Sequence, residues 1–354
     1  MSEPGNNTKQ PRRRPLRAAL GGLAAVLAVL IAAAGLVVLT PLFDRTLVSQ
    51  PAAAADYEAA MARSSALAQR DGTDIDPVCR SRVIDQGRQS EQAVVLLHGF
   101  TNCPAQFEVI AQAYAEAGYS VVVPRLPGHG AVDKLTRSPS AVTSDQLIAT
   151  ADEAIDIAAG LGQRVTVVGL SGGATVAGWS AANRSEVAEA VVIAPLVVPK
   201  AVPELLVAPL ARAARFLPDM YLWWDSGLKE ELVTPPYAYP RYSLRSLGAY
   251  LALGRATQVE DPSRSTDLER LVVVSNDHDN AVSNAGVNEL AASLGEVLGD
   301  ESTGIRVDKE FPDSAGFKHD LVDPQGENAD LLPAIYAELG PLLGLPELAD
   351  QLDR

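Results

Sequence analysis

Short, wholly apolar segments alternate with longer helical segments from residue 91 onward, and this alternation constrains the fold more than any other feature. Apolar runs of about four to eight residues are typical of parallel strands that are buried on both faces of a sheet. Helices between such strands cover the two faces. The sequence therefore predicts an α/β fold with a mostly parallel sheet. The predicted strands are 92–97, 119–123, 164–168, 190–193, 270–274 and 304–311, and the predicted helices are 104–117, 144–159, 172–183, 284–298 and 328–343.

Residues 196–262 interrupt this alternation and are rich in Pro, Leu, Tyr and Trp. The segment is too long for a simple loop. Binding sites in parallel sheets lie at the carboxyl ends of the strands. We expect an inserted helical cap over these ends. An insertion with ordinary core aromatics is the alternative.

Residues 18–43 predict one transmembrane helix. No charged residue occurs between Ala18 and Thr40, and about 20 apolar residues are enough to cross the hydrocarbon of a bilayer. Four arginines lie within residues 1–17, whereas the charges directly after the apolar segment nearly cancel. Because positive charge stays on the cytoplasmic side, we expect a single-pass membrane protein with a cytoplasmic basic tail at 1–17 and the bulk of the chain on the extracytoplasmic side.

Two other interpretations of this segment remain open. A cleaved signal peptide has an apolar core of only about 7–15 residues, although the alanines of Pro51–Ala55 offer a cleavage site. A buried core helix is disfavoured, because the segment has no polar face and would need burial on every side. After it we expect a stalk or linker at 44–90, the main domain at 91–345 and a C-terminal tail at 346–354.

The chain has two cysteines, Cys79 and Cys103. Export of the domain would permit a disulfide between them, which would stabilise the domain by roughly 3 kcal/mol through loop closure. Two free thiols are the alternative, because sequence does not give the Cα separation that a bridge requires. The spacing is unlike that of a zinc-binding pair.

The formal net charge is −15, and residues 1–43 carry five basic side chains and one acidic side chain. The rest of the chain therefore carries a charge of −19. Such an acidic domain repels nucleic acid, so we expect no nucleic-acid partner. The sequence makes no prediction about the oligomeric state.

The run Gly169-Leu-Ser-Gly-Gly173 places Ser171 between a predicted strand and a predicted helix. In this setting a G-x-S-x-G element is typical of a nucleophile elbow, in which small residues surround a serine on a strained turn. A serine N-cap with glycines for a tight turn is the alternative. We predict that Ser171 is a catalytic nucleophile.

A serine that transfers acyl groups needs backbone N–H groups directed at the developing oxyanion. We expect one from Gly172, the residue after the nucleophile. The other is expected from Phe100, in the loop His98–Thr101 that follows the first predicted strand. His98 is expected to position this loop and not to act as a base.

The serine also needs a base, and the base needs an orienting acid. For an elbow of this kind the chain order is serine, acid, histidine. Only His278 and His319 follow Ser171, and His319 comes after the last predicted strand, where the base is expected.

Two aspartates, Asp277 and Asp279, are available as the acid in the loop after strand 270–274. Either could instead be a turn residue. A metal site formed by Asp277, His278 and Asp279 is disfavoured, because adjacent residues rarely converge on one ion. We predict no metal.

Together these motifs resemble the α/β-hydrolase superfamily over roughly residues 90–345. The run Pro124-Arg-Leu-Pro-Gly-His-Gly130 is similar to the branch that contains monoacylglycerol lipases, lysophospholipases and carboxylesterases. In that family the acid lies in a D-x-x-V pattern, which Asp279 and Val282 match. The glycine that often precedes the acid is missing here, so Asp277 stays the fallback.

The resemblance implies an α/β-hydrolase fold and a Ser171–His319–Asp279 triad that cleaves carboxylic esters through an acyl-enzyme, without a cofactor. The apolar insertion and the membrane segment favour small-molecule or lipid-like ester substrates. Thioesterase, amidase or peptidase, and acyltransferase activities are alternatives on the same fold. A catalytically inactive binding module is a further alternative.

Overall fold

The computed structural model describes residues 27–29, 31–33, 35–36, 46–227, 229, 235–258, 267–298 and 304–353. The chain divides into two compact units, Met1–Arg45 and Thr46–Arg354, and the second contains all the predicted site residues. The predicted basic tail at 1–17 and most of the predicted transmembrane segment at 18–43 lie outside the described residues. Within the described part of the chain, no helix has both the length and the hydropathy needed to span a bilayer.

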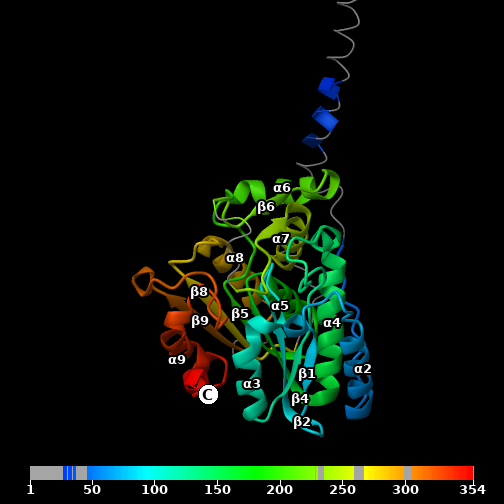
Figure 1. The fold of residues 1–354 in the computed structure, drawn as a ribbon, viewed down its shortest axis with the longest axis vertical. Helices are drawn as coiled ribbons and strands as arrows, with labels where there is room; N and C mark the ends of the chain where they lie inside the picture. Colours follow the sequence, from blue (N-terminus) through cyan, green and yellow to red (C-terminus); the bar gives the residue numbers. More distant parts are fainter. Residues whose placement is uncertain are drawn as a thin grey trace, which may run out of the picture. The chain divides into compact units, whose positions relative to one another are not determined.

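A seven-stranded sheet forms the centre of the second unit, with the strand order β1-β3-β2-β4-β5-β8-β9 (Figure 1). β1 (Arg82–Ile84) is antiparallel to β3, and the other neighbouring strands are parallel. The predicted, mostly parallel sheet is therefore confirmed. The remaining strands are β2 (Ser90–Leu97), β3 (Ser120–Val123), β4 (Gly162–Leu170), β5 (Val187–Ile193), β8 (Arg270–Asn276) and β9 (Ile305–Phe311).

Helices cover both faces of this sheet. Successive side chains of β2 show the division, because Val95 packs in one apolar cluster whereas Val94 and Leu96 pack in another. Neighbouring side chains of a strand point to opposite faces, so each cluster fills one side. The first face is covered by α2 (Tyr57–Gln69), α4 (Ser144–Leu161), α5 (Gly172–Asn183), α7 (Leu244–Gln258) and α8 (Asn284–Gly295), and the second by α3 (Glu108–Glu116) and α9 (Leu332–Leu342).

The insertion between β5 and β8 is a cap that is only partly helical. It contains α6 (Glu204–Phe216) and α7, and between them the antiparallel ribbon of β6 (Tyr221–Trp223) and β7 (Arg241–Ser243). In Figure 1, α6 and β6 lie at the top of the second unit. The prediction of a wholly helical cap was wrong for the ribbon, whose aromatic side chains favour strands.

Residues 46–90 are part of the folded domain, so the predicted stalk at 44–90 was wrong for this stretch. α2 packs against α4, and β1 extends the main sheet. Small residues make the helix contact possible, since a Cβ added to Gly160 of α4 would lie 2.8 Å from the Cβ of Ala60 in α2. Few large apolar side chains are needed at such a contact, and the hydropathy pattern does not reveal it.

The predicted C-terminal tail at 346–354 is folded as well. Its 3₁₀-helix, Leu348–Asp353, packs against α9 and α3, and the side chain of Leu348 is buried. The second core cluster therefore extends beyond the predicted boundary at residue 345.

A disulfide joins Cys79 to Cys103, with a Cα–Cα distance of 5.2 Å. Cys79 lies just before β1, and Cys103 lies in the loop after β2. The bridge, and not the alternative of two free thiols, is present. It ties the segment before the sheet to the loop that carries Phe100.

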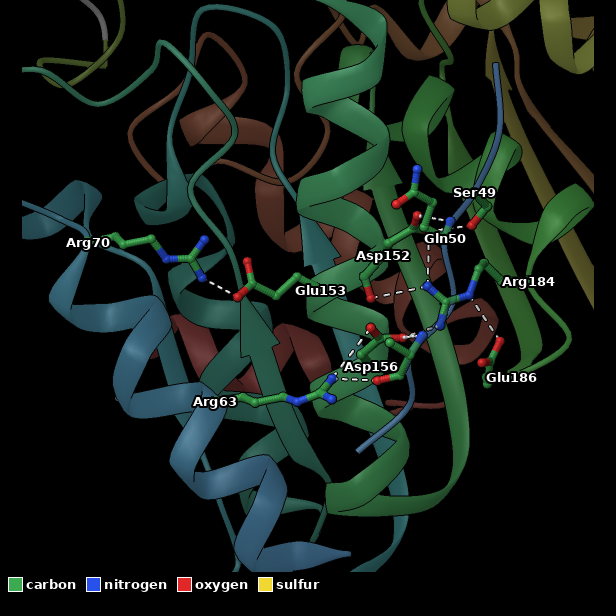
Figure 2. A network of polar contacts seen from close by, with 10 residues as sticks. Ser49, Gln50, Arg63, Arg70, Asp152, Glu153, Asp156, Arg184 and Glu186 are labelled. Atoms are coloured by element: carbon green, nitrogen blue, oxygen red, sulfur yellow. Dashed lines mark hydrogen bonds and ion pairs between the residues drawn. The ribbon is translucent and has the colours of Figure 1, made fainter. Parts of the chain in front are cut away.

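An ion-pair network holds the beginning of the second unit against α4 (Figure 2). The guanidinium of Arg184, fully buried after α5, pairs with Asp152 at 2.9 Å and with Asp156. Asp152 also accepts hydrogen bonds from the Ser49 hydroxyl and the Gln50 amide. Because these carboxylates are shielded from water, they depend on the arginine for compensation.

Replacing Arg184 by methionine should lower the free energy of unfolding by about 3–5 kcal/mol. The change leaves the buried Asp152 without its cation and leaves Asp156 with only Arg63, 3.5 Å away. Denaturant unfolding would measure the change. Arg70→Met is the matched control. Arg70 pairs with Glu153, which lies on α4 beside Asp152, but the Arg70 side chain is 57% exposed. Exposed ion pairs contribute about 1 kcal/mol or less to stability. Equal losses in the two variants would contradict this account.

Candidate active site

Ser171 occupies the turn between β4 and α5 with φ of 55° and ψ of −116°. This backbone conformation is strained for a residue with a Cβ, and it persists only where neighbouring structure enforces it. Here the Ser171 amide donates to the Ile193 carbonyl at the end of β5, at 2.9 Å. The predicted strand–turn–helix setting of Ser171 is therefore present.

Two glycines of the motif are required by close packing. A Cβ on Gly173 would lie 1.9 Å from the Leu97 carbonyl oxygen, and a Cβ on Gly169 would lie 2.3 Å from the Gly173 carbonyl oxygen. No side chain fits at either distance. Gly173 lets the first turn of α5 approach the end of β2, and Gly169 lets the same turn approach the end of β4.

The two predicted oxyanion donors are close neighbours. A Cβ on Gly172 would lie 3.0 Å from the Phe100 amide nitrogen. Thr101, next to Phe100, has a strained φ of 67°. The cap holds it, because the Trp224 indole N–H donates to the Thr101 hydroxyl at 3.0 Å and the Tyr239 amide donates to the Thr101 carbonyl at 2.8 Å.

The Phe100 side chain is surrounded by aromatic rings of the cap. Ring centroids lie 5.1 Å away for Tyr250, 5.9 Å for Tyr242 and 6.3 Å for Trp224. The cap therefore packs directly on the loop that carries the predicted Phe100 donor.

His98 positions this loop, as predicted. Its Nε2 accepts a hydrogen bond from the Leu126 amide at 3.0 Å, so the neutral ring carries its proton on Nδ1, which donates to the Gly99 carbonyl at 3.0 Å. Burial, together with the nearby His129, lowers the pKa of His98 well below its ordinary value. A neutral imidazole with both nitrogens bonded to the backbone holds the loop in place.

Asp279 and His319 form a hydrogen-bonded pair, with Oδ2 of the carboxylate 2.7 Å from Nδ1 of the imidazole. The other carboxylate oxygen accepts from the amides of Ala281 at 2.7 Å and Val282 at 2.8 Å. The Asp279 side chain is buried and its orientation is determined by these bonds. One nitrogen of His319 is thereby held towards the acid.

The electrostatics of this pair favour its ionised forms. Partial burial lowers the pKa of His319, but the charge and hydrogen bond of Asp279, with smaller effects from Asp320 and Glu327, outweigh burial and raise the pKa above its ordinary value. Burial raises the pKa of Asp279, but the imidazole and the two backbone N–H groups outweigh burial and lower this pKa.

The other polar residues of the acid loop have separate partners. Asp277 is exposed and accepts from the Asn284 side chain at 2.9 Å, and His278 Nδ1 lies 2.8 Å from the Asp313 carboxylate. Asp279, and not the fallback Asp277, is therefore bonded to His319. Because Asp277, His278 and Asp279 have different partners, they do not converge on a common metal position.

Strand order brings the three predicted catalytic residues to one edge of the sheet. Ser171 follows β4, Asp279 follows β8 and His319 follows β9, and the strands β4-β5-β8-β9 are successive parallel neighbours. Carboxyl ends of neighbouring parallel strands lie at the same edge, where α/β folds bind their ligands.

Two asparagines that the sequence interpretation missed support the loop of His319. The Asn276 side-chain amide donates to the carbonyls of Phe317 at 2.6 Å and Lys318 at 3.2 Å. Asn328 accepts from the Lys318 amide and donates to its carbonyl, both at 2.9 Å. No motif marks these asparagines, and only the fold shows which backbone groups they meet.

Comparison with known proteins identifies the family of this chain. A family model described as "Alpha/beta hydrolase family" matches residues 94–330. The chain is 35% identical over 95 residues to the thermostable monoacylglycerol lipase of Bacillus sp. (strain H-257), which covers 27% of this chain and 36% of that lipase. The matched part is thus only about a third of that relative's length.

Solved structures share the fold at low sequence identity. A structure of the metagenome-derived lipolytic enzymes LipS and LipT has a TM-score of 0.55 and 19% identity, covering 76% of this chain and 99% of that chain. A soluble variant of the Saccharomyces cerevisiae monoglyceride lipase has a TM-score of 0.55 and 14% identity, covering 75% and 90%. The Paleococcus ferrophilus monoacylglycerol lipase has a TM-score of 0.54 and 17% identity, covering 77% and 98%.

Proposed function

Because this chain belongs to the α/β hydrolase family, we propose that it is a membrane-anchored serine hydrolase that cleaves carboxylic esters through Ser171, His319 and Asp279. The hydrogen bond of 2.7 Å between Asp279 and His319 carries the proposal. It lies at the edge of the sheet that also bears the strained Ser171.

The proposed reaction begins when Nε2 of His319 takes the proton of the Ser171 hydroxyl and the serine oxygen attacks the ester carbonyl. Asp279 accepts from Nδ1–H, which leaves a lone pair on Nε2 and stabilises the imidazolium that forms. The amides of Phe100 and Gly172 hold the oxyanion. His319 then protonates the leaving alcohol, and a water molecule, deprotonated by His319, releases the acid from Ser171.

Exposed apolar side chains on the cap support lipid-like acyl esters as substrates. Leu205 on α6 is 86% exposed, and large apolar side chains that are at least 46% exposed continue along α6 and the segment after it. Large exposed apolar groups favour contact with lipid over water. The monoacylglycerol lipase named among the relatives supports monoacylglycerol-like esters in particular. The further exposed side chains are Leu206, Leu210, Phe216, Leu217 and Met220.

The proposed anchor is the uncharged segment at 18–43, with the N-terminus in the cytoplasm and the hydrolase domain on the other side of the membrane. Immunoblotting of membrane and soluble fractions tests it. We expect the full-length chain in the membrane fraction after alkaline washing. A shortened product found only in the soluble fraction would contradict the anchor and favour a cleaved signal.

A fluorophosphonate probe and a series of p-nitrophenyl esters from acetate to palmitate test the activity. We expect covalent labelling of one serine and turnover that changes with acyl chain length. Peptide mapping should place the label on Ser171. A folded protein that neither labels nor cleaves any ester would overturn the proposal and favour a binding module.

The pH dependence of kcat/KM should show an acid limb above the ordinary imidazole pKa of about 6.5. His319 must be neutral to accept a proton, and its raised pKa keeps it protonated up to a higher pH, so activity is lost as the pH falls through that value. Initial rates between about pH 5 and about pH 8 measure the limb.

Glu327→Gln provides the matched test, since the Glu327 charge raises the pKa of His319. The acid limb should move to lower pH in this variant while the rate at the optimum stays unchanged. Asp330→Asn, which removes a neighbouring exposed charge, should leave the limb in place. A limb that does not move in Glu327→Gln would refute this assignment of the titrating group.

A further inference from the structure

The side chain of Gln106 connects the loop of the proposed oxyanion donor to the loop of the proposed base. Its Oε1 accepts from the Gly99 amide at 2.6 Å, and its Nε2 donates to Oδ2 of Asp320 at 2.8 Å. Gly99 precedes Phe100, and Asp320 follows His319. Gln106 is buried, and it therefore joins two parts of the site that are more than two hundred residues apart in sequence.

The chemistry of its two partners determines which way the Gln106 amide faces. The Gly99 N–H can only donate, so it must meet the carbonyl oxygen of the glutamine, and a carboxylate can only accept, so it must meet the NH₂ group. If the Gln106 amide were turned over, its NH₂ group would face the Gly99 N–H and its oxygen would face the Asp320 carboxylate, so neither hydrogen bond could form. Asp320 thus holds Gln106 in the single orientation that accepts from Gly99.

Asp320 is itself held by the backbone that follows His319. Its second oxygen accepts from the amides of Val322 at 3.2 Å and Asp323 at 3.1 Å. Burial raises the pKa of Asp320 above its ordinary value, and the bonds from Gln106 and these two amides offset only part of that effect. The acceptor that orients Gln106 therefore moves with the turn that carries the base.

A second carboxylate of the same turn holds the other end of the oxyanion loop. The Asn102 side chain donates to Asp323 at 3.1 Å, and the Tyr237 hydroxyl of the cap donates to its other oxygen at 2.6 Å. The loop 99–102 is thus tied to the turn 319–323 at both ends, with Phe100 between the two ties.

We propose that Gln106 and Asp320 are positioning residues, a relay that holds the Phe100 amide in register with His319 for stabilisation of the oxyanion. The inference rests on the proposed serine-hydrolase function. Oxyanion donors act only at the position where charge develops, and displacement of a donor lowers the rate of the chemical step far more than substrate binding. Loss of the relay should therefore reduce kcat and leave KM nearly unchanged.

A reciprocal exchange of the two functional groups tests the relay. Gln106→Glu opposes two carboxylates, and Asp320→Asn presents an NH₂ group to the NH₂ group of Gln106. The double variant restores complementarity, because the carboxylate introduced at position 106 accepts hydrogen bonds from the Gly99 amide and from the side-chain amide introduced at position 320. The double variant also has the same net charge as the original pair. We expect each single variant to lower kcat by about tenfold or more and the double variant to recover most of this loss.

Rates are compared at the pH optimum of each variant, because the Asp320 charge also raises the pKa of His319. Gln112→Glu is the control: this glutamine of α3 is exposed and bonded only to Glu116 among the contacts described, at 3.2 Å. Its kcat should match that of the unaltered enzyme. Thermal unfolding of every variant separates loss of activity from loss of fold.

Recovery in the double variant, even where a single variant fails to fold, supports the relay. The relay would be overturned if the single variants kept kcat within about twofold of the unaltered enzyme. It would also be overturned if the double variant did not fold, or if its kcat were no higher than that of the worse single variant. These results leave the proposed function standing as long as the unaltered enzyme labels with fluorophosphonate and turns over esters. An unaltered enzyme that does neither overturns the proposed function, and the relay with it.

Discussion

Replacing Ser171 by alanine should lower kcat for p-nitrophenyl ester hydrolysis by roughly a million-fold, a loss typical of enzymes whose nucleophile and base act as a unit. The variant loses the only atom that can form the acyl-enzyme, so covalent labelling by fluorophosphonate should disappear as well. KM should change little, because the hydroxyl contributes more to the transition state than to substrate binding. Steady-state kinetics and in-gel fluorescence measure both effects.

Ser180→Ala is the matched control for this variant. Ser180 is a buried serine of α5, the helix that follows Ser171, and its hydroxyl donates to the Val176 carbonyl one turn earlier. Its removal should leave the rate and the labelling unchanged. Full ester turnover by Ser171→Ala would show that another group is the nucleophile, and the proposed mechanism would have to be abandoned.

Asp279→Asn should lower kcat by about ten-thousand-fold without loss of the folded structure. An asparagine that presents its NH₂ group to Nδ1 forces the imidazole proton onto Nε2, where it prevents His319 from accepting the serine proton. The geometry changes little, since the two backbone amides that bond Asp279 can still donate to the amide oxygen. The kinetics should therefore show a loss in kcat with a nearly constant KM.

Asp277→Asn is the matched control, two residues away in the same loop. Its carboxylate is exposed and accepts from Asn284, not from His319, so the rate should stay within about twofold of the unaltered enzyme, as for other exposed sites outside the machinery. The opposite outcome, a large loss in Asp277→Asn with activity retained in Asp279→Asn, would make Asp277 the acid.

The proposed site is assembled from loops that other parts of the fold hold in place. The disulfide of Cys103 lies beside the loop of Phe100, and the cap contacts Thr101 through Trp224 and Tyr239. Strain at Thr101 can persist because the two cap contacts compensate for it, and strain at Ser171 is held by the bond of its amide to the Ile193 carbonyl. Variants in the cap are therefore expected to affect the chemical step as well as the choice of substrate.

Local sequence patterns were sufficient to predict the sheet, the turn at Ser171 and the positions of His98 and His319 in loops that follow strands. Uniformly apolar strands and a glycine-flanked serine follow from short-range requirements, which are burial on two faces and close approach of backbone at Gly173. Such requirements restrict the residue types at neighbouring positions, so they can be recognised without knowledge of the fold.

The same patterns failed where the contacts depend on small or polar residues. Residues 46–90 were expected to form a stalk, yet α2 packs on α4 through Ala60 and Gly160, whose side chains contribute little to hydropathy. The ribbon in the cap was missed because each of its strands has only three residues. Periodicity cannot be recognised over so short a length.

The sequence by itself determined the α/β class, the order of the motifs and the one serine in an elbow setting, because each is a property of a few consecutive residues. Tertiary structure alone decided that Asp279 and not Asp277 bonds His319, and that Gln106 meets both Gly99 and Asp320. These choices depend on the direction of side chains brought together from distant segments. Differences of one or two positions in a loop reverse that direction, and only the packed fold determines it.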